Sequence, residues 1–319
     1  RLSRIHTLLY CLLLAAVPGL SGCDFVSERV FTYMMEPGPP DAPDGVVAHR
    51  DIVFNERAGR QLQLDLYVPE TASTEPTPVV LFLFGGGWER GNRHQMIRFG
   101  LLDYPQRGIA VVTADYSYIH EAIFPAQIED VEAAIRWVRD NAAAYNLNDD
   151  RIGVIGPSAG GHLAAIAGTA NRPGERDASA AQGVRTDVQA VVNFYGPTDF
   201  SQADAHRLPD ADPWNAPDSR PSRLLGAPID DVPGRVAAAN PITYVDGSEP
   251  PFLIIHGEKD ALVPLHQSQI LQQALQEAGV QSELLVIEGG DHGFGGDFYS
   301  SLPMDRMDAF FELHLKGES

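Results

Sequence analysis

The sequence is poor in cysteine and in positive charge. Of its 319 residues, two are cysteines and two, Lys259 and Lys316, are lysines. Acidic residues outnumber basic ones 43 to 23, and the formal net charge is −20. Proteins that bind nucleic acid neutralise its phosphates with clustered Lys and Arg, so this balance argues against nucleic acid as a partner.

Motifs that bind phosphate or calcium are also lacking. Residues 81–92 read LFLFGGGWERGN, in which an apolar run enters three glycines, but neither G-x-x-x-x-G-K-[ST] nor G-x-G-x-x-G follows Phe84. The acidic stretches NLNDDR and PDADPW lack the D-x-[DN]-x-[DN]-G spacing of a calcium loop. We therefore expect no metal and no organic cofactor, and the glycines suit backbone amides that face an oxyanion.

The N-terminus lacks a hydrophobic run long enough to cross a bilayer. The apolar run Leu8–Val17 follows Arg1 and Arg4 and is broken by a Pro-Gly pair. A charged start followed by a short apolar stretch is typical of a secretory signal, so residues 1–22 are predicted to be a signal peptide.

Cys23 ends the stretch LSGC, which resembles the lipobox of bacterial lipoproteins, in which this cysteine is lipidated and becomes the first mature residue. The alternative is ordinary cleavage near Gly22 with an incidental cysteine. Because Cys11 lies inside the signal, Cys23 would then be a single free thiol in an exported protein, and no disulfide is possible in the mature chain. We expect a membrane-anchored lipoprotein that faces the periplasm or the cell exterior.

Residues 23–45 are predicted to be the lipidated N-terminus and a tether. They end in a run rich in Pro, Gly and Asp, which is typical of a semi-rigid spacer, although VFTYMM at residues 30–35 offers the alternative of docking on the domain. Residues 46–319 show no internal repeat, so we expect one catalytic domain. Within it the Pro-, Asp- and Asn-rich stretch 196–248 is a candidate cap.

Strand and helix patterns alternate along this domain. IVFNE and the alternating Leu62–Val68 predict antiparallel edge strands, and residues 126–146 carry the apolar stripe of an amphipathic helix. Continuous apolar runs predict strands buried on both faces of a mainly parallel sheet. The fold class is therefore α/β, with about eight strands and helices on both faces. The continuous runs are Val79–Phe84, Ile109–Ala114, Ile152–Ile155, Val188–Phe194, Phe252–His256 and Leu284–Ile287.

The spacing Gly156-x-Ser158-x-Gly160 follows a buried strand and precedes an Ala-rich helix. It is the G-x-S-x-G nucleophile elbow, whose sharp turn tolerates only small flanking residues. A serine hydroxyl is a weak nucleophile, so a base must accept its proton and a carboxylate must fix the tautomer of that base.

The partners of Ser158 are expected in the order serine, acid, histidine. His292 stands in GGDHGFGG, a glycine-bounded loop after the last strand, whereas His266 and His314 fall in helices. The loop HGEKD offers Asp260 as the acid, with Glu258 as the alternative. Two neighbours are predicted to be structural: Asp291 as a loop-capping side chain, and His256 as a strand-end histidine.

These motifs, together with TADYSY, FPAQIEDVEAAIRWV and DHGF, resemble the α/β-hydrolase superfamily over residues 60–316. Within it they resemble carboxylesterases of the hormone-sensitive-lipase type and their feruloyl-esterase and acetyl-xylan-esterase relatives, which carry H-G-G-G-[WF]. The resemblance implies an oxyanion hole formed by the amides of Gly86 and Gly87, with Ala159 from the elbow. Each such donor is typically worth about 3 kcal/mol in the transition state.

Two residues depart from that family. Phe84 occupies the place of the histidine that helps hold the glycine loop, and Pro157 precedes the nucleophile where a polar residue is common. Trp88 is a candidate for the substrate pocket, with packing on the loop as the alternative. Tyr116, just past a strand end, is a second candidate, although a structural role is the favoured interpretation for it.

The sequence thus predicts a serine hydrolase that cleaves carboxylic esters through an acyl-enzyme. Short acyl or acetyl esters are the expected substrates, either small molecules or carbohydrate-linked. A serine exopeptidase of the prolyl-oligopeptidase kind shares the fold, but it usually needs a large gating domain at its N-terminus. A non-catalytic binding lipoprotein is the third alternative. The sequence predicts no oligomeric state.

Overall fold

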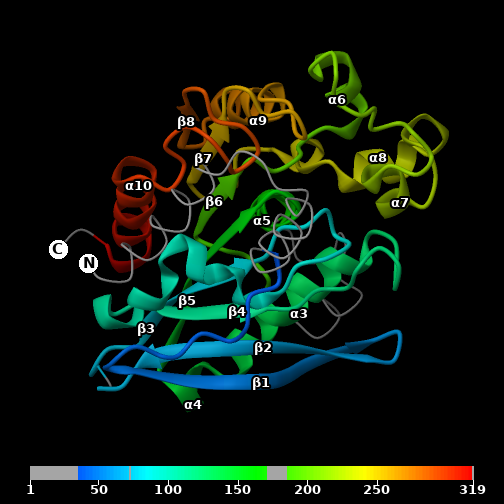
Figure 1. The fold of residues 1–319 in the computed structure, drawn as a ribbon. Coiled ribbons are helices and arrows are strands. Elements are labelled where there is room, and N and C mark those ends of the chain that lie inside the picture. Colours follow the sequence, from blue (N-terminus) through cyan, green and yellow to red (C-terminus); the bar gives the residue numbers. More distant parts are fainter. Residues whose placement is uncertain (1–34, 72, 171–184, 318–319) are drawn as a thin grey trace, which may run out of the picture.

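A computed structural model of the chain describes residues 35–71, 73–170 and 185–317. The signal peptide and Cys23 of the sequence prediction lie outside these residues. The described chain forms one eight-stranded sheet in the order β1-β2-β4-β3-β5-β6-β7-β8 (Figure 1). The strands are β1 (Val46–Arg57), β2 (Arg60–Pro69), β3 (Thr77–Leu83), β4 (Ala110–Ala114), β5 (Leu147–Pro157), β6 (Ala190–Phe194), β7 (Phe252–Gly257) and β8 (Ser282–Ile287).

The pairing of the strands follows their hydrophobic patterns. The alternating strands β1 and β2 form an antiparallel pair at one edge, and β2 also pairs antiparallel with β4. All the other neighbours are parallel. The short strands β4, β6 and β7 are buried throughout, as expected for apolar runs covered on both faces. The predicted mostly parallel α/β sheet of about eight strands is confirmed.

Helices cover both faces of the sheet. In β5, Gly153 leaves room for Phe311 of α10, and in β6 Val191 lies beside Gly168 of α5. Gly153 pairs with Ala190, so it faces away from the side on which Val191 lies, and α5 and α10 are on opposite faces. The α-helices are α3 (Ala126–Asp140), α4 (Ala142–Tyr145), α5 (Ala159–Thr169), α6 (Phe200–His206), α7 (Arg220–Leu225), α8 (Pro233–Ala239), α9 (His266–Glu277) and α10 (Ser301–Phe311).

The amphipathic pattern over residues 126–146 yields two helices rather than one. The apolar stripe of α3 is buried, as predicted. α3 ends just before Asn141, whose side-chain amide donates to the carbonyl of Trp137, and α4 ends just before Asn146, which has the left-handed conformation. Asn and short polar residues compete for backbone hydrogen bonds, which explains the break.

The segment between β6 and β7 carries α6, α7 and α8 and lies apart from the edge strands β1 and β2 (Figure 1). It contacts loops that follow the carboxyl ends of three strands. Leu224 accepts from the amide of Phe124, and Trp214 donates to the carbonyl of Leu262. Arg223 pairs with Glu89. The segment therefore lies where ligands of parallel α/β sheets usually bind.

In the described ranges, no helix combines the length and apolarity that a bilayer crossing requires.

The remaining helical turns flank these elements. One group, η2, η3 and η4, connects β3 to β4, and another, η6 and η7, lies between β6 and β7. The chain is described to Gly317, just after the last turn. Their bounds are η2 (Arg93–Phe99), η3 (Leu101–Asp103), η4 (Pro105–Arg107), η6 (Ile229–Asp231), η7 (Pro241–Tyr244) and η8 (Glu312–Lys316).

Candidate active site

Ser158 occupies the turn between β5 and α5. Its backbone has φ 53° and ψ −119°, outside the regions that ordinary side chains favour. Its amide donates to the carbonyl of Phe194 at 2.8 Å, which holds this strained conformation in place. A Cβ at Gly156 would lie 2.3 Å from the carbonyl carbon of Gly160, and one at Gly160 would lie 2.1 Å from the carbonyl oxygen of Leu83. The turn therefore needs both glycines.

The structure brings Ser158, His292 and Asp260 together. His292 Nε2 lies 2.8 Å from Ser158 Oγ, and His292 Nδ1 lies 2.7 Å from Asp260 Oδ2. Asp260 follows the end of β7 and His292 follows the end of β8, the adjacent strand. This is the geometry by which a histidine can accept a serine proton while a carboxylate holds its other nitrogen.

Asp260 is buried and almost completely hydrogen-bonded. It is 2% exposed, and its Oδ1 accepts from the amides of Leu262 and Val263 at 2.9 and 2.8 Å. Burial acts to raise the pKa of Asp260, but the charge and hydrogen bonds of His292 and His256 outweigh it and hold the pKa well below its usual range. The carboxylate thus stays ionised and accepts from His292.

The alternative acids lie elsewhere. The Glu258 carboxylate accepts from the amide of Gly289, at the base of the histidine loop. Asp291 accepts from the amides of Ala261 and His292, so its predicted role as a loop-capping residue is confirmed. It joins the loop of the acid to that of the histidine.

The other histidines occupy structural positions. His266 stacks on His206 with ring centroids 3.4 Å apart, and His314 contacts Phe310 edge-on. His256 is fully buried between Ser268 Oγ and the carbonyl of Val263, as predicted for a strand-end histidine. Its Nε2 also lies 3.2 Å from Asp260 Oδ2, a contact that the sequence prediction did not include.

The glycine loop after β3 lies against the elbow. A Cβ at Gly85 would come within 2.9 Å of the carbonyl oxygen of Pro157 and 3.5 Å of Ser158 Cβ. Gly86 and Gly87 have φ values of 136° and 64°, which favour glycine. Across the described chain, the amides of Gly86, Gly87 and Ala159 donate no hydrogen bond to another protein group. They are thus free to donate to an oxygen beside Ser158.

Phe84 is held by aromatic packing in place of a polar contact. Its ring stacks on Tyr116 with centroids 4.1 Å apart and planes 11° apart, and the Tyr116 hydroxyl donates to the Phe84 carbonyl. Tyr116 is fully buried, which agrees with the structural role that the sequence favoured for it over the substrate pocket. It supports the strand end that leads into the glycine loop.

Trp88 is also a packing residue. It is 3% exposed, and its ring lies edge-on to His162 and tilted against Phe200 of α6. Of the two interpretations of Trp88, packing on the loop therefore agrees with the structure: the indole fills the space between the glycine loop and the segment after β6. Its φ of 55° continues the unusual backbone of Gly86 and Gly87.

Two residues that sequence reasoning missed contribute to the site. Gln95 of η2 is 2% exposed, accepts from the Gly85 amide at 3.1 Å and donates to the Gly85 carbonyl at 3.2 Å. Tyr195 has φ 42°, and its ring centroid lies 4.7 Å from that of His292. Burial keeps the pKa of Tyr195 well above its ordinary value. Tyr195 could have been found as the first residue beyond a buried strand, whereas no pattern singles out Gln95.

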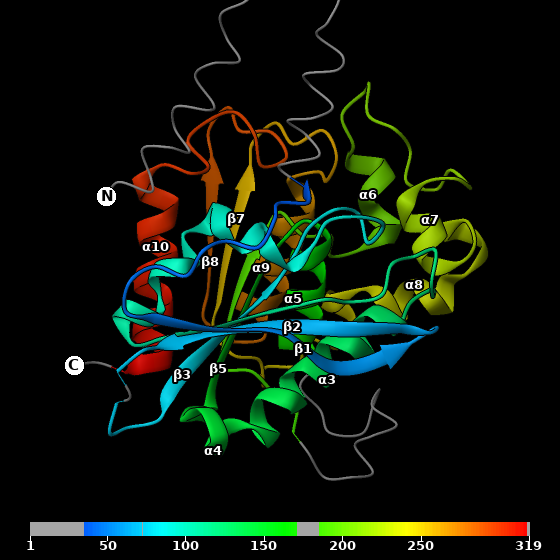
Figure 2. The ribbon, with the colours of Figure 1, turned by 60° about the horizontal axis from the view of Figure 1, so that its bottom comes forward.

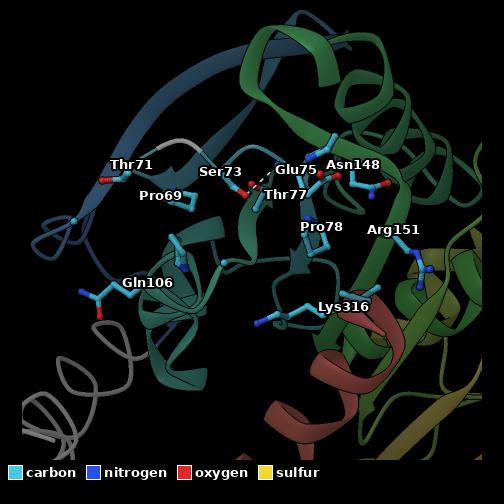
Figure 3. A pocket seen from close by; sticks show the side chains of 15 residues that line it. Pro69, Thr71, Ser73, Glu75, Thr77, Pro78, Gln106, Asn148, Arg151 and Lys316 are labelled. Atoms are coloured by element: carbon cyan, nitrogen blue, oxygen red, sulfur yellow. Dashed lines mark hydrogen bonds between the residues drawn. The ribbon is translucent and has the colours of Figure 1, made fainter. Parts of the chain in front are cut away.

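A cavity lies at the other end of the sheet. It has a volume of about 750 Å³ and is lined by Thr77 and Asn148, at the starts of β3 and β5, and by Lys316 (Figure 3). Asn148 is ten residues before Ser158 along β5, or about 33 Å in an extended strand. This cavity has no part in the constellation around Ser158.

Comparison with known proteins gives one family. The BD-FAE family model matches residues 64–275, which include Gly86, Ser158 and Asp260 but not His292. Esterase LipQ of Mycobacterium tuberculosis is 35% identical over 224 residues, which cover 69% of this chain and 51% of LipQ. Esterase LipC of the same organism is 33% identical, over 81% of this chain and 64% of LipC. The chain thus spans about half to two thirds of the length of these curated relatives.

Solved structures share the fold over nearly their whole length. A truncated carbohydrate esterase from gut microbiota matches with a TM-score of 0.73 and 29% identity, over 88% of this chain and 99% of that one. A thermophilic esterase from Thermogutta terrifontis matches with a TM-score of 0.69 and 26% identity, over 88% and 96%. Its butyrate-bound form matches with a TM-score of 0.66 and 27% identity, over 85% and 94%.

Proposed function

We propose that this chain, which belongs to the BD-FAE family and has the α/β-hydrolase fold, is a serine hydrolase that cleaves carboxylic esters. The observation that carries the proposal is the hydrogen-bonded triad in which His292 contacts Asp260 through Nδ1 and Ser158 through Nε2, with both distances at or below 2.8 Å. The names of its relatives, which are esterases, support the same reaction class.

In the first half-reaction, Ser158 Oγ attacks the ester carbonyl carbon while His292 Nε2 accepts the hydroxyl proton. The carbonyl π electrons move onto the oxygen, and a tetrahedral oxyanion forms. When the intermediate collapses, the bond to the alcohol breaks and His292 donates its proton to the leaving oxygen. Water then repeats the sequence on the acyl-enzyme and releases the acid.

The developing oxyanion would accept from the amides of Gly86, Gly87 and Ala159. These donors are fixed before the reaction, so they stabilise the charge without reorganisation, and each contributes about 3 kcal/mol. Asp260 holds His292 with Nδ1 protonated and Nε2 free to accept, which is the tautomer that the attack needs.

The test is hydrolysis of p-nitrophenyl acetate and butyrate by the purified chain and by Ser158→Ala. We expect kcat/KM to fall by at least about 10³-fold in the variant. Ser248→Ala is the matched control, because Ser248 is exposed, lies before β7 and, among the residues that the structure describes, hydrogen-bonds only to Asp246 in its own turn. Unchanged turnover by Ser158→Ala would disprove the mechanism, and absence of a fluorophosphonate adduct on Ser158 of the active chain would do the same.

We further propose short acyl or acetyl esters as substrates. Support comes from the packed aromatic residues at the glycine loop, and from the structure of the Thermogutta esterase with butyrate bound. The similarity to a carbohydrate esterase supports carbohydrate-linked esters as one subclass. An acyl-length series of p-nitrophenyl esters tests the first proposal. Release of acetate from acetylated xylan, compared with a simple acetyl ester, tests the second, which fails if only the simple ester reacts.

We also propose that the chain is an exported lipoprotein anchored through Cys23. The support is the sequence LSGC directly after a short apolar run. Mass spectrometry of the protein from a bacterial host, with Cys23→Ser as the control, would detect the lipid. If the protein is recovered in the soluble fraction with Cys23 unmodified, the proposed lipid anchor is refuted.

A further inference from the structure

We propose that the arm, residues Met35–Pro40, positions the glycine loop, residues 85–87, and thereby supports hydrolysis at the proposed esterase site. This inference rests on the proposed function. The arm is the blue segment that precedes β1 and runs back from the sheet edge across the molecule (Figure 2). It meets the chain again at residues 86–95, about fifty positions further on in sequence.

Three hydrogen-bond contacts hold the arm on the segment that follows the glycine loop. The Met35 carbonyl accepts from Gln95 Nε2 at 2.6 Å, and the Pro37 carbonyl accepts from Asn92 Nδ2 at 3.1 Å. His94 Nδ1 lies 3.2 Å from the same Pro37 carbonyl. Pro37 itself is buried. Backbone carbonyls supply all these acceptors, so the contacts depend on the path of the arm more than on its side chains.

Gln95 transmits the contact to the loop. Its carboxamide has one oxygen and two N–H groups, and all of them are used: the oxygen accepts from the Gly85 amide, and Nε2 donates to the carbonyls of Gly85 and Met35. If the carboxamide were flipped, its oxygen would face two carbonyl oxygens. The Met35 carbonyl therefore helps to fix the one orientation in which Gln95 clamps the peptide of Gly85.

Met35 also touches the loop directly. A Cβ at Gly86 would lie 3.2 Å from Met35 Cε, so the methionine methyl group covers one side of this glycine. From α7, Arg220 covers the next glycine, where a Cβ at Gly87 would lie 2.2 Å from Arg220 Cδ. The two glycines that carry the proposed donors are thus held from two separate parts of the chain.

The loop needs such support because glycine is the most mobile residue. Fixing one residue costs about 1–2 kcal/mol of backbone entropy, and glycine loses more than the others. The usual histidine is absent at Phe84, so no imidazole anchors this strand end. A displacement of about 1 Å at a reacting centre can cost on the order of 100-fold in rate. An arm that restrains Gly85 and Gly86 would therefore act on kcat.

The first test compares variants of Met35 in the full chain. Met35→Ala removes the methyl contact, Met35→Leu retains most of its apolar bulk, and Asp41→Ala changes an exposed residue just outside the arm. We expect kcat for p-nitrophenyl butyrate to fall about three- to tenfold in Met35→Ala with KM unchanged. Met35→Leu should recover most of it, and Asp41→Ala should match the wild type. Wild-type kcat in Met35→Ala would count against the inference.

The second test releases the arm. A recognition sequence for a site-specific protease is inserted after the exposed Asp41, the folded protein is cleaved, and the freed N-terminal fragment is removed by size exclusion. We expect the uncut protein to be active and the cut protein to lose about tenfold or more in kcat, with a thermal midpoint close to that of the uncut form. A synthetic peptide of residues 30–41 should restore activity. A cut protein with unchanged kcat would overturn the inference.

Fluorophosphonate labelling separates the two proposals. If Ser158 of the uncut protein is not labelled and no ester is cleaved, the proposed function itself fails. If Ser158 is labelled and esters are cleaved equally well before and after the arm is removed, only the inference about the arm fails.

Discussion

Replacing Phe84 with histidine restores the residue typical of this family, and we expect it to harm the protein. Phe84 is fully buried and stacked on Tyr116 at 4.1 Å. Loss of that pair removes about 0.5–1.5 kcal/mol beyond its buried area. A buried imidazole without a partner adds about 1–3 kcal/mol of desolvation. The free energy of unfolding should therefore fall by about 2–4 kcal/mol, which lowers Tm by roughly 4–16 °C in a domain of this size.

The same change should not raise kcat. Gln95 already holds the amide and the carbonyl of Gly85, which is the restraint that a histidine would otherwise provide. The assay is a thermal melt together with kcat for p-nitrophenyl butyrate at 25 °C. Phe84→Leu is the control, because it loses the stacking but buries no polar group, and its Tm should lie between the other two. A variant Phe84→His with higher kcat and an unchanged Tm would refute the reasoning.

Three further predictions concern the loop, the acid and the ion pair beside the site. Gly86→Ala should abolish folded, active protein, because its Cβ would lie 2.0 Å from the backbone oxygen of Arg90. At Gly87 the three atoms nearest to a Cβ all belong to the flexible Arg220 side chain, so Gly87→Ala should cost about 1 kcal/mol of stability and lower kcat; expression, Tm and kcat of the two variants test this. Asp260→Asn should lower kcat about 10³- to 10⁴-fold. The pKa of Asp260 is lowered on folding, so its carboxylate stabilises the wild type at pH values above the ordinary carboxyl pKa of about 4. This contribution to the free energy of unfolding is lost as the pH falls below that value. Asp260→Asn should lack this part of the pH dependence of unfolding. Glu89→Gln breaks ion pairs whose side chains are 30–42% exposed, so Tm should change by less than about 4 °C, and a larger loss would show that the pairs are stronger than surface ion pairs usually are.

The sequence predicted the parts of the site that depend on local pattern. Each of Ser158, Asp260 and His292 follows a strand of the parallel part of the sheet within a few residues, and the carboxyl ends of parallel strands meet at one edge of a sheet. Their types and order were therefore sufficient to expect them together. The flanking glycines of the elbow were likewise predictable, because a sharp turn excludes larger residues there.

The supports of the site were not predictable in this way. Gln95 lies in a segment with no repeating pattern, and its partner Met35 is sixty residues away. Arg220 and Glu89 are separated by 131 residues. Single contacts over such distances depend on how loops fold back on the sheet, and they leave no periodic trace in the sequence. For the same reason the sequence favoured a structural role for Tyr116 without identifying its partner, since the position of Tyr116 after a strand did not reveal that its ring turns inward against Phe84.

If Cys23 is lipidated as proposed, the course of the arm limits how far the site around Ser158 can lie from the membrane. Only eleven residues, 24–34, separate Cys23 from Met35, and a fully extended chain covers about 3.3–3.6 Å per residue. With Cys23 lipidated as proposed, Gly86 and the neighbouring Ser158 are confined to within about 40 Å of the bilayer surface. Esters on lipids or on polymers close to the membrane lie within that shell, whereas a soluble ester must first diffuse into it.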